Sequence, residues 1–176
     1  MLKKIASWFD FRKTVIIIGG NSELGTALTK KFGRTWIKRW NVFNIDAQLN
    51  ANANYNFFLD LSKPITNEDV TRLHTELKKN FKEIDAMINL AEPPARQPLS
   101  IADANIFETY NQERMMAIQS SILLTHLSSN FLSANGYVAF NGGNPSLFQG
   151  GEMGIEIDSI TRIAKGVATK QGLDLS

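Results

Sequence analysis

A glycine-rich turn near the start of the chain has the composition of a phosphate-binding loop. Residues 19–25 read GGNSELG and directly follow the β-branched run TVIII at 14–18. Gly19 and Gly25 therefore lie between a predicted strand and a predicted helix, where a turn without side chains lets a pyrophosphate reach the amides at the positive helix end. Two glycines also suit a plain strand-to-helix turn, and the pattern alone leaves both interpretations open.

A carboxylate at the end of the next predicted strand favours the first interpretation. Asp46 ends the segment NVFNID at 41–46 and lies 21 residues after Gly25. A carboxylate in that position accepts hydrogen bonds from an adenosine ribose and repels an additional 2′-phosphate. Together the two signals predict a site for NAD(H) in preference to NADP(H), although aspartate is also common as a turn residue at strand ends.

Other chemistry-bearing residues are scarce. The chain has no cysteine, which excludes disulfides and thiol catalysis and is consistent with a reducing compartment such as the mitochondrial matrix or the cytoplasm. Its two histidines, His74 and His126, have no second ligand at metal-binding spacing, so no metal cofactor is expected. A formal net charge of +2, without a dense basic run, gives no reason to expect nucleic acid as a partner.

Strands alternate with helices along the chain. The predicted strands are 14–18, 41–46, 56–61, 84–91 and 136–140, and the predicted helices are 23–35, a helix capped by Thr66, 103–131 and 156–170. This alternation predicts an α/β fold, a three-layer, Rossmann-like, doubly wound parallel sheet that binds ligands beyond the carboxyl ends of its strands. With 176 residues, 43% of them hydrophobic, we expect one such nucleotide-binding domain over residues 14–176.

Two of the predicted helices carry apolar stripes that should pack on the sheet. The stripe of the first helix is Leu24, Ala27, Leu28 and Phe32, and that of the long helix is Met116, Leu123, Leu127 and Phe131, widened by Ile118 and Ile122. Both stripes recur at spacings of three and four residues, as the buried face of a helix does.

The order and spacing of these segments resemble the short-chain dehydrogenase/reductase family, and within it most closely the dihydropteridine reductases. The segments that carry the resemblance are VIIIGGNSELG, NVFNID, FLDL, MINLA, GYVAFNGG and AKG, and together they span about residues 13–170. The resemblance implies an NAD(H)-binding Rossmann-like fold. It also implies that the cofactor contacts named residues, which are Gly19, Asn21, Leu24 and Gly25 at the pyrophosphate, Asp46 at the adenosine ribose, Asp60 with Leu61 at the adenine edge, Asn89 and Ala91 along the cofactor, and Lys165 at the nicotinamide ribose.

The sequence departs from the family pattern inside the nucleotide half. Glu23 stands where the family commonly has a further glycine, and Ser22 where the dihydropteridine reductases have one. Glu92 takes a position that is often glycine and would place a carboxylate near the nicotinamide. Glu23 suits a helix N-terminus electrostatically, but it would oppose a pyrophosphate if its side chain pointed inward.

The departures are greater in the catalytic half. The resemblance implies a tyrosine four residues before Lys165 as the proton donor for hydride transfer, and that position holds Thr161. An aliphatic hydroxyl is a far weaker acid than a phenol, whose pKa is about 10, and a nearby ammonium cannot close that gap. No tyrosine occurs between 138 and 176, and the serine usual after the fifth strand is replaced by Gly142 or Gly143.

The two ends of the chain raise separate expectations. Residues 1–13, MLKKIASWFDFRK, form an amphipathic extension that suits contact with a membrane or a partner, an organellar address, or packing on the domain's own surface. Family members typically continue for about two strands and a helix beyond the lysine helix, whereas this sequence ends at Ser176. The fifth strand is therefore expected near an exposed sheet edge that something else covers.

Three functions fit these observations. The favoured one is a catalytically degenerate relative that serves as a structural or regulatory subunit of a larger assembly, for example a mitochondrial one, and can retain NAD(H). The second is an active NADH-dependent reductase of the dihydropteridine reductase type that takes its proton from ordered water or Glu152, and the third is a sensor of NADH. Protein partners or a homodimer would use the helices at 103–131 and 156–170.

Overall fold

The computed structural model describes residues 12–34, 40–91 and 106–140 of the chain. In chain order its elements are β1 (Thr14–Ile18), α2 (Glu23–Arg34), β2 (Asn41–Asp46), β3 (Tyr55–Phe58), α3 (Asn67–Asn80), β4 (Ile84–Asn89), α4 (Ile106–Phe131) and β5 (Leu132–Phe140). The five strands form one parallel sheet in the order β3-β2-β1-β4-β5. The expected helix at 156–170 and the extension up to residue 11 lie outside the described residues.

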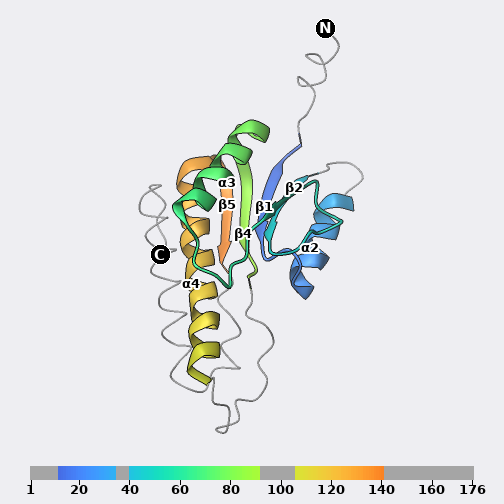
Figure 1. The fold of residues 1–176 in the computed structure, drawn as a ribbon. Coiled ribbons are helices and arrows are strands. Elements are labelled where there is room, and N and C mark those ends of the chain that lie inside the picture. Colours follow the sequence, from blue (N-terminus) through green and yellow to red (C-terminus); the bar gives the residue numbers. More distant parts are fainter. Residues whose placement is uncertain (1–11, 35–39, 92–105, 141–176) are drawn as a thin grey trace, which may run out of the picture.

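Strand β1 is the centre of the sheet, and both of its faces are buried. Ile16 and Ile18 belong to a core shared with α3 and α4, whereas Val15 and Ile17 face the opposite way, toward α2. Figure 1 shows the same arrangement, with α3 and α4 on one side of the sheet and α2 on the other. The three-layer, doubly wound α/β fold predicted from the sequence is therefore confirmed.

Helix α2 buries only part of its predicted apolar stripe: Leu28 and Phe32 pack against the core as expected. Leu24 is 51% exposed and Ala27 is exposed, whereas Gly25 and Thr29 are buried. The prediction for Leu24 and Ala27 was therefore wrong. The physical reason is that Gly25 has no side chain and lies directly on the turn after β1, which brings the helix close to the sheet at that residue and rotates Leu24 outward.

Helix α3 begins at the predicted cap. The Thr66 hydroxyl accepts a hydrogen bond from the Asp69 amide at 3.2 Å, and the Asp69 carboxylate accepts one from the Thr66 amide at 3.1 Å, which makes a capping box. The buried side of the helix is formed by Leu73 and Leu77, both fully buried. The helix therefore has both a local start signal and an apolar anchor in the core.

Helix α4 packs on the sheet largely as predicted. Leu123, Leu127 and Phe131 are buried, but Ile122 is 54% exposed, so the expected widening of the stripe was wrong at that residue. The buried side is widened instead by serines whose hydroxyls bond back to carbonyls of the same helix, such as Ser121 to Ala117 at 2.9 Å. Because such a hydroxyl has a hydrogen-bond partner, its burial does not leave an unsatisfied polar group in the core.

The bounds of β3 and β5 differ from the predicted ones, β3 being shorter and β5 longer. Strand β3 stops at Phe58, since Asp60 starts a turn in which its backbone carbonyl accepts from the Lys63 amide at 3.2 Å. Strand β5 begins at Leu132, directly after α4, and has a register irregularity opposite β4. Within the described sheet β5 is an edge strand, as expected, and its Tyr137 is 69% exposed.

Among the described helices, none combines the length and the apolarity that crossing a membrane requires.

The close packing at Gly25 predicts a specific loss of stability. In Gly25→Ala the new Cβ would overlap the carbonyl oxygen of Gly19 and lie 2.8 Å from two backbone atoms of Gly20, so we expect unfolding to cost about 1–3 kcal/mol less, as for other overpacked sites. Urea denaturation followed by circular dichroism measures this change. Gly33→Ala is the matched control on the same helix, because its Cβ would meet only the carbonyl oxygen of Asn52, at 3.3 Å. Equal losses in the two variants would contradict the packing described for Gly25.

Candidate nucleotide site

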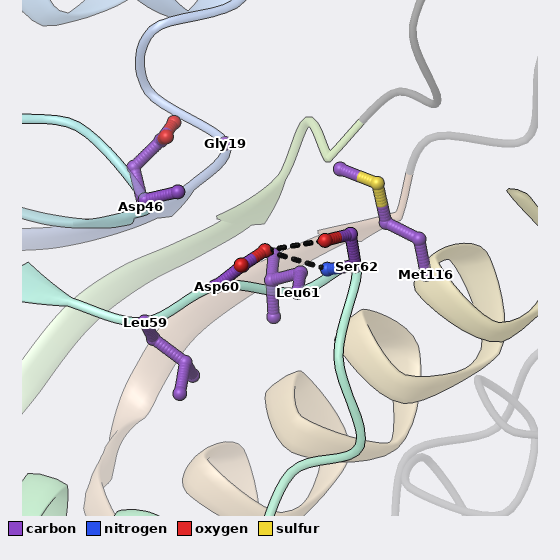
Figure 2. Close-up of a pocket in the computed structure, with 8 residues that line it drawn as sticks. Gly19, Asp46, Leu59, Asp60, Leu61, Ser62 and Met116 are labelled. Atoms are coloured by element: carbon purple, nitrogen blue, oxygen red, sulfur yellow. Dashed lines mark hydrogen bonds between the residues drawn. The ribbon is translucent and has the colours of Figure 1, made fainter. Parts of the chain in front are cut away.

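A cavity lies at the carboxyl edge of the sheet, where a doubly wound fold binds its ligands. Its volume is about 170 Å³, and it is lined by Gly19, Asp46, Ala47, Leu59, Asp60, Leu61, Ser62 and Met116. Four of the residues predicted to contact a cofactor, Gly19, Asp46, Asp60 and Leu61, thus share one cavity (Figure 2). It is smaller than the about 300–1,000 Å³ of sites for drug-sized ligands, so it suits one part of a dinucleotide.

The turn after β1 begins at Gly19, which packs through its backbone. Gly19 has φ of +78°, a conformation that side chains rarely adopt, and its amide donates to the Ile45 carbonyl at 2.9 Å. A Cβ on Gly19 would lie 2.6 Å from two backbone atoms of Ala91, so this turn packs directly on the chain beyond β4. The structure therefore brings Gly19 and Ala91 together, and their contact is backbone to backbone.

Ser22, a departure from the family pattern, is the N-cap of α2. Its hydroxyl accepts from the Gly25 amide at 3.0 Å and donates to the Gly19 carbonyl at 2.9 Å. The first-turn amides of Glu23 and Leu24 have no acceptor within the helix, as at any helix start, and both of these side chains are exposed. The helix start therefore offers amides and a positive dipole end at the same edge as the cavity.

Two backbone amides orient the carboxylate of Asp46. One oxygen accepts from the Asn21 amide at 3.0 Å, and the other accepts from the Gln48 amide at 3.2 Å. The Asn21 side chain donates to the Gln48 carbonyl at 2.7 Å and so ties the turn after β1 to the turn after β2. An ionised carboxylate has about four acceptor positions, so Asp46 keeps capacity for the hydroxyls of a ribose.

Asp60 adds a second negative charge to the cavity. Its carboxylate accepts from the Ser62 hydroxyl at 2.6 Å and the Ser62 amide at 3.1 Å, and it pairs with the Lys63 ammonium at 3.1 Å. The hydrogen bond from the Ser62 side chain, followed by that from Lys63, holds the pKa of Asp60 below its ordinary value. Figure 2 shows this carboxylate bonded to Ser62 beside the buried Leu61.

An asparagine network holds the turn after β1 in place, and it was not predicted from the sequence. Asn50 is 2% exposed, and its side chain donates to the Gly20 carbonyl at 2.6 Å. Asn56 accepts from the Asn50 amide at 2.9 Å and from the Asn44 side chain at 3.0 Å. The signal that was overlooked is asparagine at every second position from 50 to 56, beside Asn44 on the preceding strand.

The side chain of Asn89 makes its hydrogen bonds within the protein. Its amide nitrogen donates to the hydroxyls of Ser120, at 2.9 Å, and Ser121, at 3.3 Å, and its oxygen accepts from the Ala91 amide at 3.1 Å. Asn89 therefore links β4 to α4 and shapes the chain that Gly19 packs on. The two serines were not recognised from the sequence, where they stand as neighbours in an otherwise apolar stretch of helix.

The predicted catalytic positions lie outside the described residues. These are Thr161, Lys165 and the alternative proton source Glu152, and Glu92 lies outside them as well. The described geometry therefore covers the half of the site that the sequence predicts for adenosine and pyrophosphate. Seven of the named residues line the cavity or the turn beside it: Gly19, Asn21, Leu24, Gly25, Asp46, Asp60 and Leu61.

Solved structures of similar fold are short-chain dehydrogenases. A family member from Francisella tularensis subsp. tularensis SCHU S4 has a TM-score of 0.69 at 20% identity, over 92% of this chain and 64% of that one. A structure from Leptospira borgpetersenii with bound NAD+ has a TM-score of 0.64 at 17% identity, over 92% of this chain and 68% of that one. A structure from Burkholderia multivorans with bound NADP has a TM-score of 0.60 at 14% identity, over 92% of this chain and 74% of that one. No family model and no curated protein matches the sequence.

At identities this low, structural similarity establishes the architecture of the chain but does not establish its activity. The chain spans 64% of the length of the first of these structures. Its five parallel strands and flanking helices have the Rossmann-like α/β fold of the short-chain dehydrogenase/reductase structures.

Proposed function

We propose that this protein binds NAD(H) at the carboxyl edge of its sheet without transferring hydride, and that it acts as a structural or regulatory subunit of a larger assembly. The observation that carries the proposal is the cavity in which Gly19, Asp46, Asp60 and Leu61 converge. It lies beside the start of α2, so an adenosine in the cavity would place its pyrophosphate near the first-turn amides.

The charges of the cavity support NAD(H) over NADP(H). Asp46 and Asp60 both line it, and the pKa of Asp60 is below its ordinary value, so that carboxylate is ionised at neutral pH. A further phosphate on the ribose would meet this negative charge, whereas ribose hydroxyls donate to it. Structures of similar fold have been solved with either cofactor, so the preference proposed here depends on these two side chains.

The absence of hydride transfer is proposed from the sequence of the catalytic half. Thr161 stands where a phenol would supply the proton, four residues before Lys165. Among the enzymes of this fold, the dihydropteridine reductases fit the motif order best, since they do without the serine after the fifth strand. We propose that Lys165 is retained for the nicotinamide ribose.

The role as a subunit is supported by the edge of the sheet. Strand β5 is the last strand of the described sheet, and its Tyr137 is 69% exposed. An edge strand presents unpaired backbone groups that another strand can pair with, and native proteins normally cover them. We propose that a protein partner contributes to this cover, either a different chain or a second copy that docks through α4 and residues 156–170.

A direct binding test separates NADH from NADPH. With NADH at 100 times its dissociation constant, the free energy of unfolding should rise by about 2.7 kcal/mol, with a smaller rise at equal NADPH. Asp46→Asn keeps one hydrogen-bond acceptor but removes the negative charge. It should therefore reduce the difference between the rises in the free energy of unfolding that NADH and NADPH cause. Asp85→Asn is the matched control, because Asp85 accepts from Thr14 at the opposite end of the strands, at 2.8 Å. Thermal unfolding of the native chain and both variants, each with NADH and with NADPH, measures all six combinations.

Two results would contradict the proposal. If millimolar NADH left the unfolding temperature unchanged, the cavity would not be a cofactor site. If the protein oxidised NADH in the presence of quinonoid pterins or quinones, it would be a reductase, and the proposed absence of hydride transfer would be wrong.

The asparagine network should affect cofactor affinity through the turn it holds. Asn50→Ala removes the shorter of two hydrogen bonds to the buried carbonyl of Gly20 and leaves it only the 3.4 Å bond from the Thr26 hydroxyl, which should lower stability by about 1–3 kcal/mol and weaken NADH binding by about tenfold as the turn shifts. Asn52→Ala is the control, because the exposed Asn52 side chain makes only a 3.4 Å contact with Asn50. Isothermal titration of the two variants distinguishes them, and unchanged NADH affinity in Asn50→Ala would show that the network has no part in binding.

The proposed subunit role predicts the size of the native protein. Size-exclusion chromatography of a gentle extract from the source, detected with an antibody, should place the protein well above the mass of one chain. The recombinant chain alone is the reference. A stable free monomer in the extract would contradict the subunit role and would leave the cofactor site untouched.

A further inference from the structure

Two histidines from different helices meet on the side of the molecule away from α2. His74 lies on α3 and His126 on α4, 52 residues apart in the sequence, and their Nε2 atoms are 3.0 Å apart. The rings are inclined by only 19°, with centroids 4.9 Å apart, and the Phe131 ring packs edge-on against His74 at 5.0 Å. These are the two histidines of the whole chain.

We propose that His74 and His126 form a two-histidine site for a late first-row divalent cation such as Zn²⁺ or Ni²⁺, which joins α3 to α4. Imidazole nitrogens bind Zn²⁺ at about 2.0–2.1 Å, so two of them on one ion at roughly 95° to each other lie about 3 Å apart. The Nε2 atoms already have this separation. The two rings are stacked with 19° between their planes, so each imidazole would have to turn about its χ2 bond for both lone pairs to reach one ion.

The protonation state of His74 suits metal binding. Partial burial, then the neighbouring His126 and Lys78, holds the pKa of His74 below its ordinary value. His74 is therefore largely neutral at pH 7, which is the form that binds a metal. Lys78 is the charged group that opposes a cation here.

The other coordination positions would be filled by water. No group of three or more His, Cys, Asp or Glu side chains is placed to hold a metal ion within the parts of the chain that the structure describes. A site with two protein ligands binds more weakly than a closed four-ligand structural site. His126, though not His74, also lines a cavity of about 380 Å³ together with Gln119 and Ile122, so open space adjoins one of the two imidazoles.

The position of the pair indicates what a bound ion would do. Helices α3 and α4 cover the same face of the sheet, and Leu77 and Leu127 belong to one buried core beneath the two histidines. An ion held by both imidazoles would link the helices across their outer surface. Since it binds the folded arrangement and the unfolded chain offers only two separate imidazoles, it would raise stability.

The test uses the full chain without an affinity tag, titrated with ZnCl₂ or NiCl₂ alone at pH 7.5. We expect a saturable rise in unfolding temperature and one ion per chain by isothermal titration. His74→Gln and His126→Gln should each weaken binding at least tenfold, since an amide can replace a hydrogen bond but not an imidazole ligand. Asn130→Ala, one turn after His126 on α4, is the control and should bind as the native chain does. The native response should weaken as the pH falls, because protons compete with the metal ion for the imidazole nitrogens.

A second measurement applies even if a variant fails to fold. In ¹⁵N spectra of the native chain only two imidazoles contribute, so Zn²⁺ should shift both Nε2 resonances together. No rise in unfolding temperature and no shift at millimolar metal would overturn the proposal and leave a hydrogen-bonded pair. Equal metal responses in the native chain and both glutamine variants would also overturn it. None of these outcomes bears on NADH binding.

Discussion

The burial of β1 on both faces is the constraint on which most of the site depends. Because all five of its residues lie inside the core, the chain can leave the sheet after Ile18 only through a turn with little side-chain volume. Gly19 meets that need by packing on the backbone of Ala91, and Gly25 brings α2 onto the same turn. Since α2 begins there, its first-turn amides lie at the carboxyl edge, so close packing and a capacity for anions have one structural cause.

The parts of the fold that local patterns determine were predicted well. β1 and β2 have the bounds expected from their β-branched and alternating runs, and α3 begins after the predicted cap at Thr66. The errors arose where a tertiary contact overrode the pattern. Leu24 was expected in the core by periodicity, but the approach at Gly25 decides which face of α2 is buried.

The candidate site was predictable to the extent that its residues follow strand ends. Asp46 and Asp60 share a cavity because parallel strands bring their carboxyl ends to one edge. The hydrogen bond from Asn50 to Gly20 joins residues 30 apart, and the contact of His74 with His126 joins residues 52 apart. Neither follows from spacing, since both depend on which elements become neighbours in space.

The two kinds of site residue carry different information about function. Gly19 and Gly25 are required by packing, so their presence alone does not show that a nucleotide binds. Asp46 accepts hydrogen bonds from two backbone amides, and the side-chain oxygen of an asparagine could accept one of them. The fold therefore needs an acceptor at this position but does not need a negative charge. The same holds for the hydrogen bonds that Asp60 accepts from Ser62. The Asp60 carboxylate is paired with the Lys63 ammonium, whereas Asp46 accepts from backbone amides, which carry no net charge. It is therefore the charge of Asp46, more than the glycines, that supports the proposed ribose site.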